Sequence, residues 1–399
     1  VPAGDALRWI AHDESNDILC FYLLNRGKNY ADYREALKYF TAPAQNFIFA
    51  SNDKDIAITP SGKLPLKFKD QGKFILDGSD PANDWQGWIP PEQNPTVKNP
   101  PRGFVSSANQ SSTDQTYTYY INWRFEQYYR GKRINDKLNA MHNATVDSMR
   151  IMQSDNYSML AQDVLPAMLK YIDASKMDAE QLAAFNFIKN WDKQYAANSI
   201  GASIFNKWWL NFYNLVWADK FVVKGVFLKV PSYDRTEKLL LTEPNSKWFD
   251  NTTTPAVETC SYVVNKAFYL TVSYMVGNYG KPGEKWQWGW VKDSYVSHLA
   301  NLPGFGTGKF FAGGTGGVIN ALRGGNGPSW RMVVQMGPTV KGYGVFPGGE
   351  SGNPGSFYYD DMFKTWKDGR LNELLFLNSA DEPSKRVKIT LNLTPTPLR

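Results

Sequence analysis

The sequence predicts a large α+β protein in which a long helical region separates two regions that contain strands. Three observations support this prediction: short apolar runs near the N terminus, helical periodicity through the middle, and glycine-rich turns between β-type runs toward the C terminus. This order differs from the regular strand–helix alternation of a parallel α/β sheet. With 399 residues, 42% of them hydrophobic, the chain can bury a large core.

The N-terminal region is expected to contain two helices and two short strands. Residues 7–24 carry apolar residues at mixed spacing, whereas Asn29–Phe40 shows a clear helical face that Asn29 can cap. Residues 46–58 read as two strands around a polar turn. Residues 59–103 are rich in proline and glycine, and their tryptophans indicate an ordered surface loop rather than a flexible linker.

The middle of the chain is predicted to be helical. Apolar residues repeat at helical spacing over residues 160–171, and Asp178 with Gln181 forms a capping-box pattern before the next apolar run. Residues 204–222 and 257–276 predict two further helices. The first of these is heavily aromatic. Its rings could stack on sugars or bases, but packing in the core is favoured because aromatic side chains dominate buried area in large domains.

The C-terminal region changes character from Gly304 onward. Glycine-rich runs at 313–317 and 324–327 separate β-type segments, and they read as turns because neither has phosphate-loop or dinucleotide-binding spacing. Residues 330–334 and 386–391 are predicted strands.

Composition argues against several classes of protein. An aromatic content of 15% is too high for a disordered chain, and a net charge of +6 from scattered residues does not favour nucleic-acid binding. Cys20 and Cys260 are expected to be buried thiols, although one bridge between them is possible. The three histidines are far apart in sequence and form no metal-binding pattern with cysteines. No run of about 18 apolar residues predicts a membrane-spanning helix.

Residue spacing alone reveals no catalytic set. Asp360 and Asp361 are adjacent, so in a strand they would point to opposite faces. His298 has no identifiable partner. Residues 349–353 resemble a nucleophile elbow but lack its final glycine.

Several segments, taken in order, resemble the penicillin acylase family of N-terminal nucleophile hydrolases. Residues 43–50 are similar to the family's P-x-Q-N-x-x-x-A-D segment, and residues 129–134 are similar to its Y-R-A-x-R-I segment. The other similar segments span most of the remaining chain: 85–90 with 99–105, 152–155, 329–333, and 347–354 with 359–361.

The resemblance implies a four-layer αββα sandwich, here partial, with a large helical insertion. The expected divisions are a core part at 1–134, a mostly helical region at 135–303, and a β-rich part at 304–399 that returns to the core. The family resemblance also implies hydrolysis of the amide bond in an N-acylated amine, such as a β-lactam side chain or an N-acyl homoserine lactone. The family's nucleophile is the first residue of a self-processed chain, and its own α-amino group is the base.

Two residues match catalytic positions of the family. Asn109 corresponds to the asparagine whose side-chain amide donates to the oxyanion, and Arg133 is matched to the active-site arginine that orders this asparagine. Val1 has no nucleophilic atom. The chain is therefore expected to be the C-terminal part of a catalytic chain, inactive without the rest of its precursor, including the alpha chain and the N-terminal part of the catalytic chain.

The remaining expectations also come from the resemblance. The protein is expected in the periplasm or secreted, and no cofactor is expected in this chain. Structural calcium is possible in the full-length parent, and Asn122 lies near an expected ligand position, but no metal ligand is assigned. The alternative is a non-catalytic binding or scaffold protein of the same fold, in which exposed aromatic residues bind a glycan or peptide.

Overall fold

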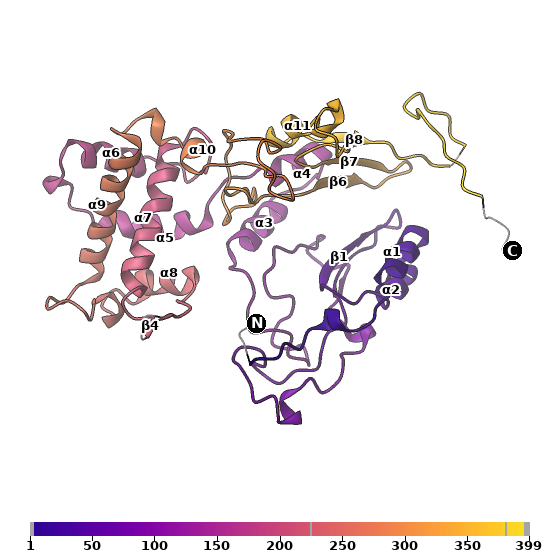
Figure 1. Ribbon diagram of the computed structural model, residues 1–399, viewed down its shortest axis with the longest axis horizontal. Helices are drawn as coiled ribbons and strands as arrows, with labels where there is room; N and C mark the ends of the chain where they lie inside the picture. Colours follow the sequence, from indigo (N-terminus) through magenta and orange to yellow (C-terminus); the bar gives the residue numbers. More distant parts are fainter. Residues whose placement is uncertain (1–3, 224–225, 380, 395–399) are drawn as a thin grey trace. The chain divides into compact units, whose positions relative to one another are not determined.

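The computed structural model describes residues 4–223, 226–379 and 381–394. The chain forms two compact units (Figure 1). The first contains the described residues up to Asn143 together with Met152–Pro328, and the second contains Ala144–Ile151 with the described residues from Ser329 onward. Two predictions about the domains stay predictions. One is the pair of divisions near residues 134 and 303, and the other is a core to which strands from the N-terminal and C-terminal regions both contribute.

The first unit begins with two helices and a small antiparallel sheet, coloured indigo to purple in Figure 1. Asn29 accepts a hydrogen bond from the backbone N–H of Asp32, so the predicted cap is confirmed. A 3₁₀ turn precedes the first helix, which therefore begins later than the sequence suggested. The elements are η1 (Ile10–His12), α1 (Asp17–Arg26), α2 (Tyr30–Leu37), β1 (Gln45–Ala50), β2 (Ile56–Ser61), η2 (Pro81–Asn83), η3 (Pro91–Gln93) and β3 (Val97–Lys98).

Aromatic packing holds these two helices against the sheet. Phe40 and Tyr33 are buried, and their rings contact Phe47 and Phe49 of β1. In the proline-rich loop between β2 and β3 the two tryptophans pack against each other, whereas Phe74 is 73% exposed. Trp85 and Trp88 meet edge to face at 5.6 Å between ring centroids.

The helical region follows from Tyr129 onward. The predicted capping box of Asp178 and Gln181 is present in full. The elements are α3 (Tyr129–Asn139), α4 (Val146–Gln153), α5 (Met159–Lys170), η4 (Ala174–Lys176), α6 (Ala179–Lys189), α7 (Ile200–Trp217), β4 (Val222–Val223), β5 (Val226–Phe227), α8 (Tyr233–Thr242), η5 (Lys247–Phe249), α9 (Cys260–Tyr279), η6 (Glu284–Trp286) and α10 (Trp288–Val291).

The aromatic helix α7 lies in the centre of the helical core, beside α9 (Figure 1). The Trp208 indole N–H donates to the carbonyl of Val264 at 3.0 Å, and its ring contacts Phe268. The Trp217 indole N–H donates to the hydroxyl of Thr236 at 2.9 Å. Because these two rings are buried and their indole N–H groups are bonded, α7 packs in the core, as predicted.

A buried carboxylate joins the start of α3 to α8. Glu237 is 7% exposed and accepts hydrogen bonds from the hydroxyls of Tyr128 at 2.9 Å and Tyr129 at 2.7 Å. The Tyr128 hydroxyl also lies 3.0 Å from a carboxylate oxygen of Asp163 on α5. Burial raises the pKa of Glu237 above its usual value of 4.5, and the two tyrosine donors only partly oppose that rise.

We expect Glu237→Gln to raise the melting temperature at pH 7. A carboxyl whose pKa is raised by folding contributes stability that is complete below its unfolded pKa and is lost as the pH rises through its folded pKa. Burying this carboxyl is therefore a cost at neutral pH, whether it stays charged or takes up a proton, and the amide removes that cost. The gain should shrink as the pH falls toward 4.5, and exposed Glu350→Gln is the control. A lower melting temperature at pH 7 would show that the tyrosine hydrogen bonds outweigh burial.

The second unit contains a three-stranded antiparallel sheet in the order β6–β7–β8. The predicted strand near 330–334 is confirmed as β6. Arg331 is 6% exposed and donates to the carbonyl of Trp366, which fixes the short helix against the sheet. The elements are β6 (Arg331–Gln335), β7 (Lys341–Val345), η7 (Phe357–Tyr359), α11 (Phe363–Lys367) and β8 (Asn372–Leu374).

The predicted strand at 386–391 is wrong. These residues form no ladder with another described segment, and Ile389 and Leu391 are 87% and 79% exposed. Alternating apolar residues fit a half-buried strand, but they make one only where a neighbouring strand supplies backbone partners.

Two further sequence predictions concern the cysteines and membrane spans. Cys20 and Cys260 are free thiols, 0% and 2% exposed, which confirms the prediction of buried thiols. Among the described residues, no helix combines the length and the hydropathy needed to cross a bilayer.

Candidate active site

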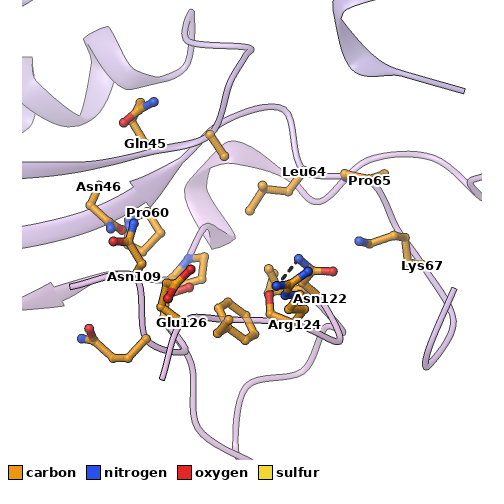
Figure 2. A pocket seen from close by; sticks show the side chains of 16 residues that line it. Gln45, Asn46, Pro60, Leu64, Pro65, Lys67, Asn109, Asn122, Arg124 and Glu126 are labelled. Carbon is orange, nitrogen blue, oxygen red and sulfur yellow. Dashed lines mark hydrogen bonds between the residues drawn. The ribbon is translucent and has the colours of Figure 1, made fainter. Parts of the chain in front are cut away.

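A pocket of about 530 Å³ opens in the first unit, between β1, the segment after β2, and the long loop that leads into α3. Figure 2 shows Asn109 near Asn46 and Pro60 on one side of the view, with Lys67 on the other. The lining combines amides, apolar groups and three charged side chains: Ala44, Gln45, Asn46, Pro60, Leu64, Pro65, Lys67, Pro95, Asn109, Gln110, Ser112, Ile121, Asn122, Arg124, Phe125 and Glu126.

Asn109 is held in this wall by its backbone and its side chain. Its φ of +67° lies in the left-handed region, which asparagine tolerates better than most residues. Its carbonyl accepts a hydrogen bond from the Glu126 N–H at 2.9 Å. Its Oδ1 accepts from Nη2 of Arg130 at 2.7 Å. A guanidinium can only donate, so the amide oxygen must face Arg130, and Nδ2 remains the donor.

Helix α3 positions the loop that carries Asn109. Gly131 is buried under the Gln110 side chain, where an added Cβ would lie 3.2 Å from Oε1 of Gln110. Oδ1 of Asn135 accepts hydrogen bonds from Arg102 at 3.1 Å and Ser106 at 3.2 Å. A small residue and a polar residue, one turn apart, therefore bring the loop close to the helix at two points.

Strand β1 also contacts this loop. The Asn46 side-chain amide donates to the hydroxyl of Ser107 at 2.7 Å. Asn46 belongs to the segment similar to P-x-Q-N, and Ser107 lies two residues before Asn109. The segment that contains Asn46 and the segment that contains Ser107 are far apart in the sequence, but the fold brings them into direct contact at the pocket.

The described residues show no hydrogen bond between Arg133 and Asn109, so the ordering role that the resemblance implied for Arg133 stays a prediction. Its guanidinium binds both carboxylate oxygens of Asp155, with Nε at 3.2 Å and Nη2 at 2.8 Å. It also lies 4.4 Å above the ring of Tyr157. Lys137 adds a second cation 3.0 Å from the same carboxylate. Arg133 therefore connects α3 to the segment between α4 and α5.

Asp155 is ionised in this position. Its side chain is only 7% exposed, and burial alone would raise its pKa. Hydrogen bonds from Arg133, Lys137 and the Tyr157 N–H together outweigh burial and lower the pKa of Asp155 below its usual value. The arrangement is that of a structural ion pair.

Arg130 is the arginine that contacts Asn109, and the sequence reasoning missed it. The segment from Tyr129 to Ile134 contains both arginines, three residues apart. A usable signal was present: helical side chains lean toward the N terminus of their helix. Arg130, in the first turn of α3, was therefore the better candidate to reach the preceding loop.

Charged groups of both signs line the pocket. Burial lowers the pKa of Lys67, whose ammonium lies 5.8 Å from the ring centre of Tyr120. Arg124 and Glu126 supply one charge of each sign. A substrate with polar and apolar parts could therefore find partners for both.

Among the described residues, no group of three or more histidine, cysteine or acidic side chains gathers where it could hold a metal ion. Asn122 uses its side chain locally: its amide donates to the carbonyl of Arg124 at 3.1 Å, and its oxygen accepts from the Trp123 N–H.

The pocket offers donors rather than an activated nucleophile. Burial raises the pKa of both Cys20 and Cys260 to about 11, so both remain protonated at neutral pH. None of the three histidines lines the pocket. Ser112 lines it, but in the described part of the chain its hydroxyl makes no hydrogen bond to a base.

Comparison with known proteins shows which family the chain belongs to. The family model for penicillin amidase matches residues 2–382, which is almost the whole chain. The chain belongs to the penicillin amidase family. It also resembles a solved structure, the thermostable penicillin G acylase from Alcaligenes faecalis, with a TM-score of 0.64 and 15% identity over 96% of this chain and 73% of that one. This likeness confirms the predicted N-terminal nucleophile hydrolase fold.

Curated relatives in the family are acylases. The chain is 24% identical to the acyl-homoserine lactone acylase QuiP of Pseudomonas aeruginosa, over 99% of this chain and 51% of that protein. It is 24% identical to QuiP of Pseudomonas fluorescens, over 91% and 48%. It is 28% identical to the penicillin acylase 2 proenzyme of a Pseudomonas species, over 36% and 18%. The chain thus spans about half the length of the QuiP proteins it matches.

Proposed function

We propose that this chain supplies the oxyanion-stabilising part of an amidase that hydrolyses the amide bond of an N-acylated amine. The observation that carries the proposal is the Asn109 side chain, whose oxygen is bound by Arg130 while its amide nitrogen remains a donor at the pocket wall. The substrate classes are the two that the family resemblance implied, N-acyl homoserine lactones and β-lactams with an acylated amine.

The proposed chemistry uses Asn109 when charge develops on the substrate. A nucleophile adds to the amide carbonyl, and the oxygen becomes an oxyanion that Nδ2 of Asn109 stabilises. The carbon–nitrogen bond then breaks, and the leaving amine takes a proton. Water next hydrolyses the acyl-enzyme and releases the acid. Arg130 is a positioning residue, because its bond to Oδ1 fixes the amide and polarises its N–H groups.

We assign the nucleophile to polypeptide outside these residues. The two cysteines are buried, and no histidine lines the pocket. The family resemblance implies that the nucleophile is the first residue of a processed chain and that its amino group is the base. The partners proposed are therefore the remaining parts of the precursor, in a periplasmic or secreted protein. We also propose that this chain contributes no cofactor site.

The test is amine release by the whole protein that carries this chain. N-acyl homoserine lactones and penicillin G are supplied separately, and the free amine is measured with an amine-reactive fluorophore. We expect release from at least one class, and none from the 399-residue chain alone. No release from either class, with saturable binding of a glycan or peptide, would support the alternative binding protein instead.

A further inference from the structure

A second pocket lies in the helical part of the first unit and shares no lining residue with the candidate active site. Its volume is about 370 Å³, and its walls come from α7, α9, α10 and the glycine-rich segment that follows. Its polar lining includes hydroxyls and three cations: Ser203, Lys207, Tyr274, Lys292, Thr315 and Arg323. The size is within the range of small-molecule sites in proteins.

The three cations have no carboxylate among the pocket residues. Within the described residues, Lys207, Lys292 and Arg323 also make no ion pair elsewhere. The ammonium of Lys207 lies 3.8 Å from the ring centre of Tyr274. Three like charges around one cavity repel each other unless a negative group joins them. Such an arrangement favours an anionic ligand.

Lys292 is held in the pocket wall by two backbone carbonyls. Its Nζ donates to the carbonyls of Gly313 at 2.5 Å and Leu322 at 3.2 Å, which fixes the side chain between two loop segments. An ammonium has three N–H groups, so one donor remains. Burial lowers the pKa of Lys292 to about 7, since no acidic side chain lines the pocket to oppose it. A bound anion would restore its charge.

Ser203 gives an independent indication of a ligand. The residue is 1% exposed and lines the pocket, yet within the described part of the chain its hydroxyl has no hydrogen-bond partner. A buried polar group without a partner costs about 1–3 kcal/mol, so such groups are rare unless something else binds them. The hydroxyl can donate to an oxygen placed among the three cations.

We propose that this pocket binds a multivalent oxyanion, with Lys207, Lys292 and Arg323 pairing with its charges and Ser203 donating to one of its oxygens. Phosphate and a small tricarboxylate share this chemistry. Leu210, Met275 and Val291 also line the pocket and offer apolar contact to a carbon skeleton. The site is separate from the proposed amidase chemistry, so either proposal can fail without the other.

Isothermal titration of the whole protein tests the site, with inorganic phosphate and citrate titrated separately in 150 mM sodium chloride, roughly physiological ionic strength. We expect saturable one-to-one binding of at least one of them. Arg323→Gln and Lys207→Gln should each weaken it about tenfold or more. Binding of phosphate alone would identify an inorganic anion site, and binding of citrate alone an organic one.

The control is Lys266→Gln, which removes the same charge from α9 outside the pocket. It should bind the anion as the wild type does. Lys292→Met should abolish binding, but its lost bonds to two carbonyls could unfold the loop, so the decision rests on the other two variants. No saturable binding of either anion, or equal binding by Arg323→Gln and wild type, would overturn the proposal.

Discussion

Replacing Asn109 by alanine in the whole protein should lower kcat about 10²–10³-fold, while KM stays within a few-fold. The Nδ2 donor gains strength only as negative charge develops on the substrate oxygen, so its loss affects the transition state far more than substrate binding. The measurement is steady-state amine release from the better substrate. Asn186→Ala, an exposed asparagine on α6, is the matched control and should leave kcat unchanged.

Two companion variants separate the donor from its support. Asn109→Asp keeps an oxygen for Arg130 but has no N–H to donate, so its kcat should fall at least as far as that of Asn109→Ala. Arg130→Leu should lose kcat with little change in KM, because the amide is no longer fixed. If Asn109→Asp retained wild-type kcat, Nδ2 would not be the oxyanion donor.

Replacing Arg133 by leucine should destabilise the protein by about 2–4 kcal/mol, because Asp155 would lose a bidentate partner and stay buried. Lys137 and the Tyr157 N–H would still bind the carboxylate, which limits the loss. The measurement is the urea midpoint of unfolding at pH 7. Arg130→Leu is the control and should unfold near the wild-type midpoint.

The pH dependence of this effect has a definite sign. Folding lowers the pKa of Asp155, so the ion pair contributes stability above the unfolded value near 3.8, and this contribution disappears as the pH falls through the folded pKa. The difference between Arg133→Leu and wild type should therefore shrink in acid. Adding Asp155→Asn to Arg133→Leu should recover part of the stability at pH 7. If Arg133→Leu were as stable as the wild type but had a kcat as low as that of Asn109→Ala, Arg133 would have a catalytic role rather than a structural one.

Local interactions explain which parts of the fold could be predicted. The Asn29 cap and the Asp178–Gln181 capping box join residues three apart, so the sequence contains both partners. The burial of α7 was predictable because so many large apolar rings in one helix have to leave water. The prediction of a strand at 386–391 was wrong because a strand needs a neighbouring strand to pair with, and its own residues do not specify one.

The candidate site, like the fold, could be predicted only in part from the sequence. The segments similar to the family identified it and pointed to Asn109 as the proposed donor. They could not decide between Arg130 and Arg133. A three-residue step turns a helix by about 300°, so the two side chains leave α3 in directions roughly 60° apart. The packing of the preceding loop on Gly131 and Asn135 places Asn109 against Arg130.

The sequence by itself determined the family, the helical middle, the capped helix starts and the buried thiols, because each depends on residue order or on contacts between near neighbours. The tertiary structure alone decided which arginine contacts Asn109, which one binds Asp155, and which cations line one pocket with Ser203. Those groups come from segments as far apart as Ser203 and Arg323. Their convergence depends on how helices and loops pack, and that packing is a property of the whole chain.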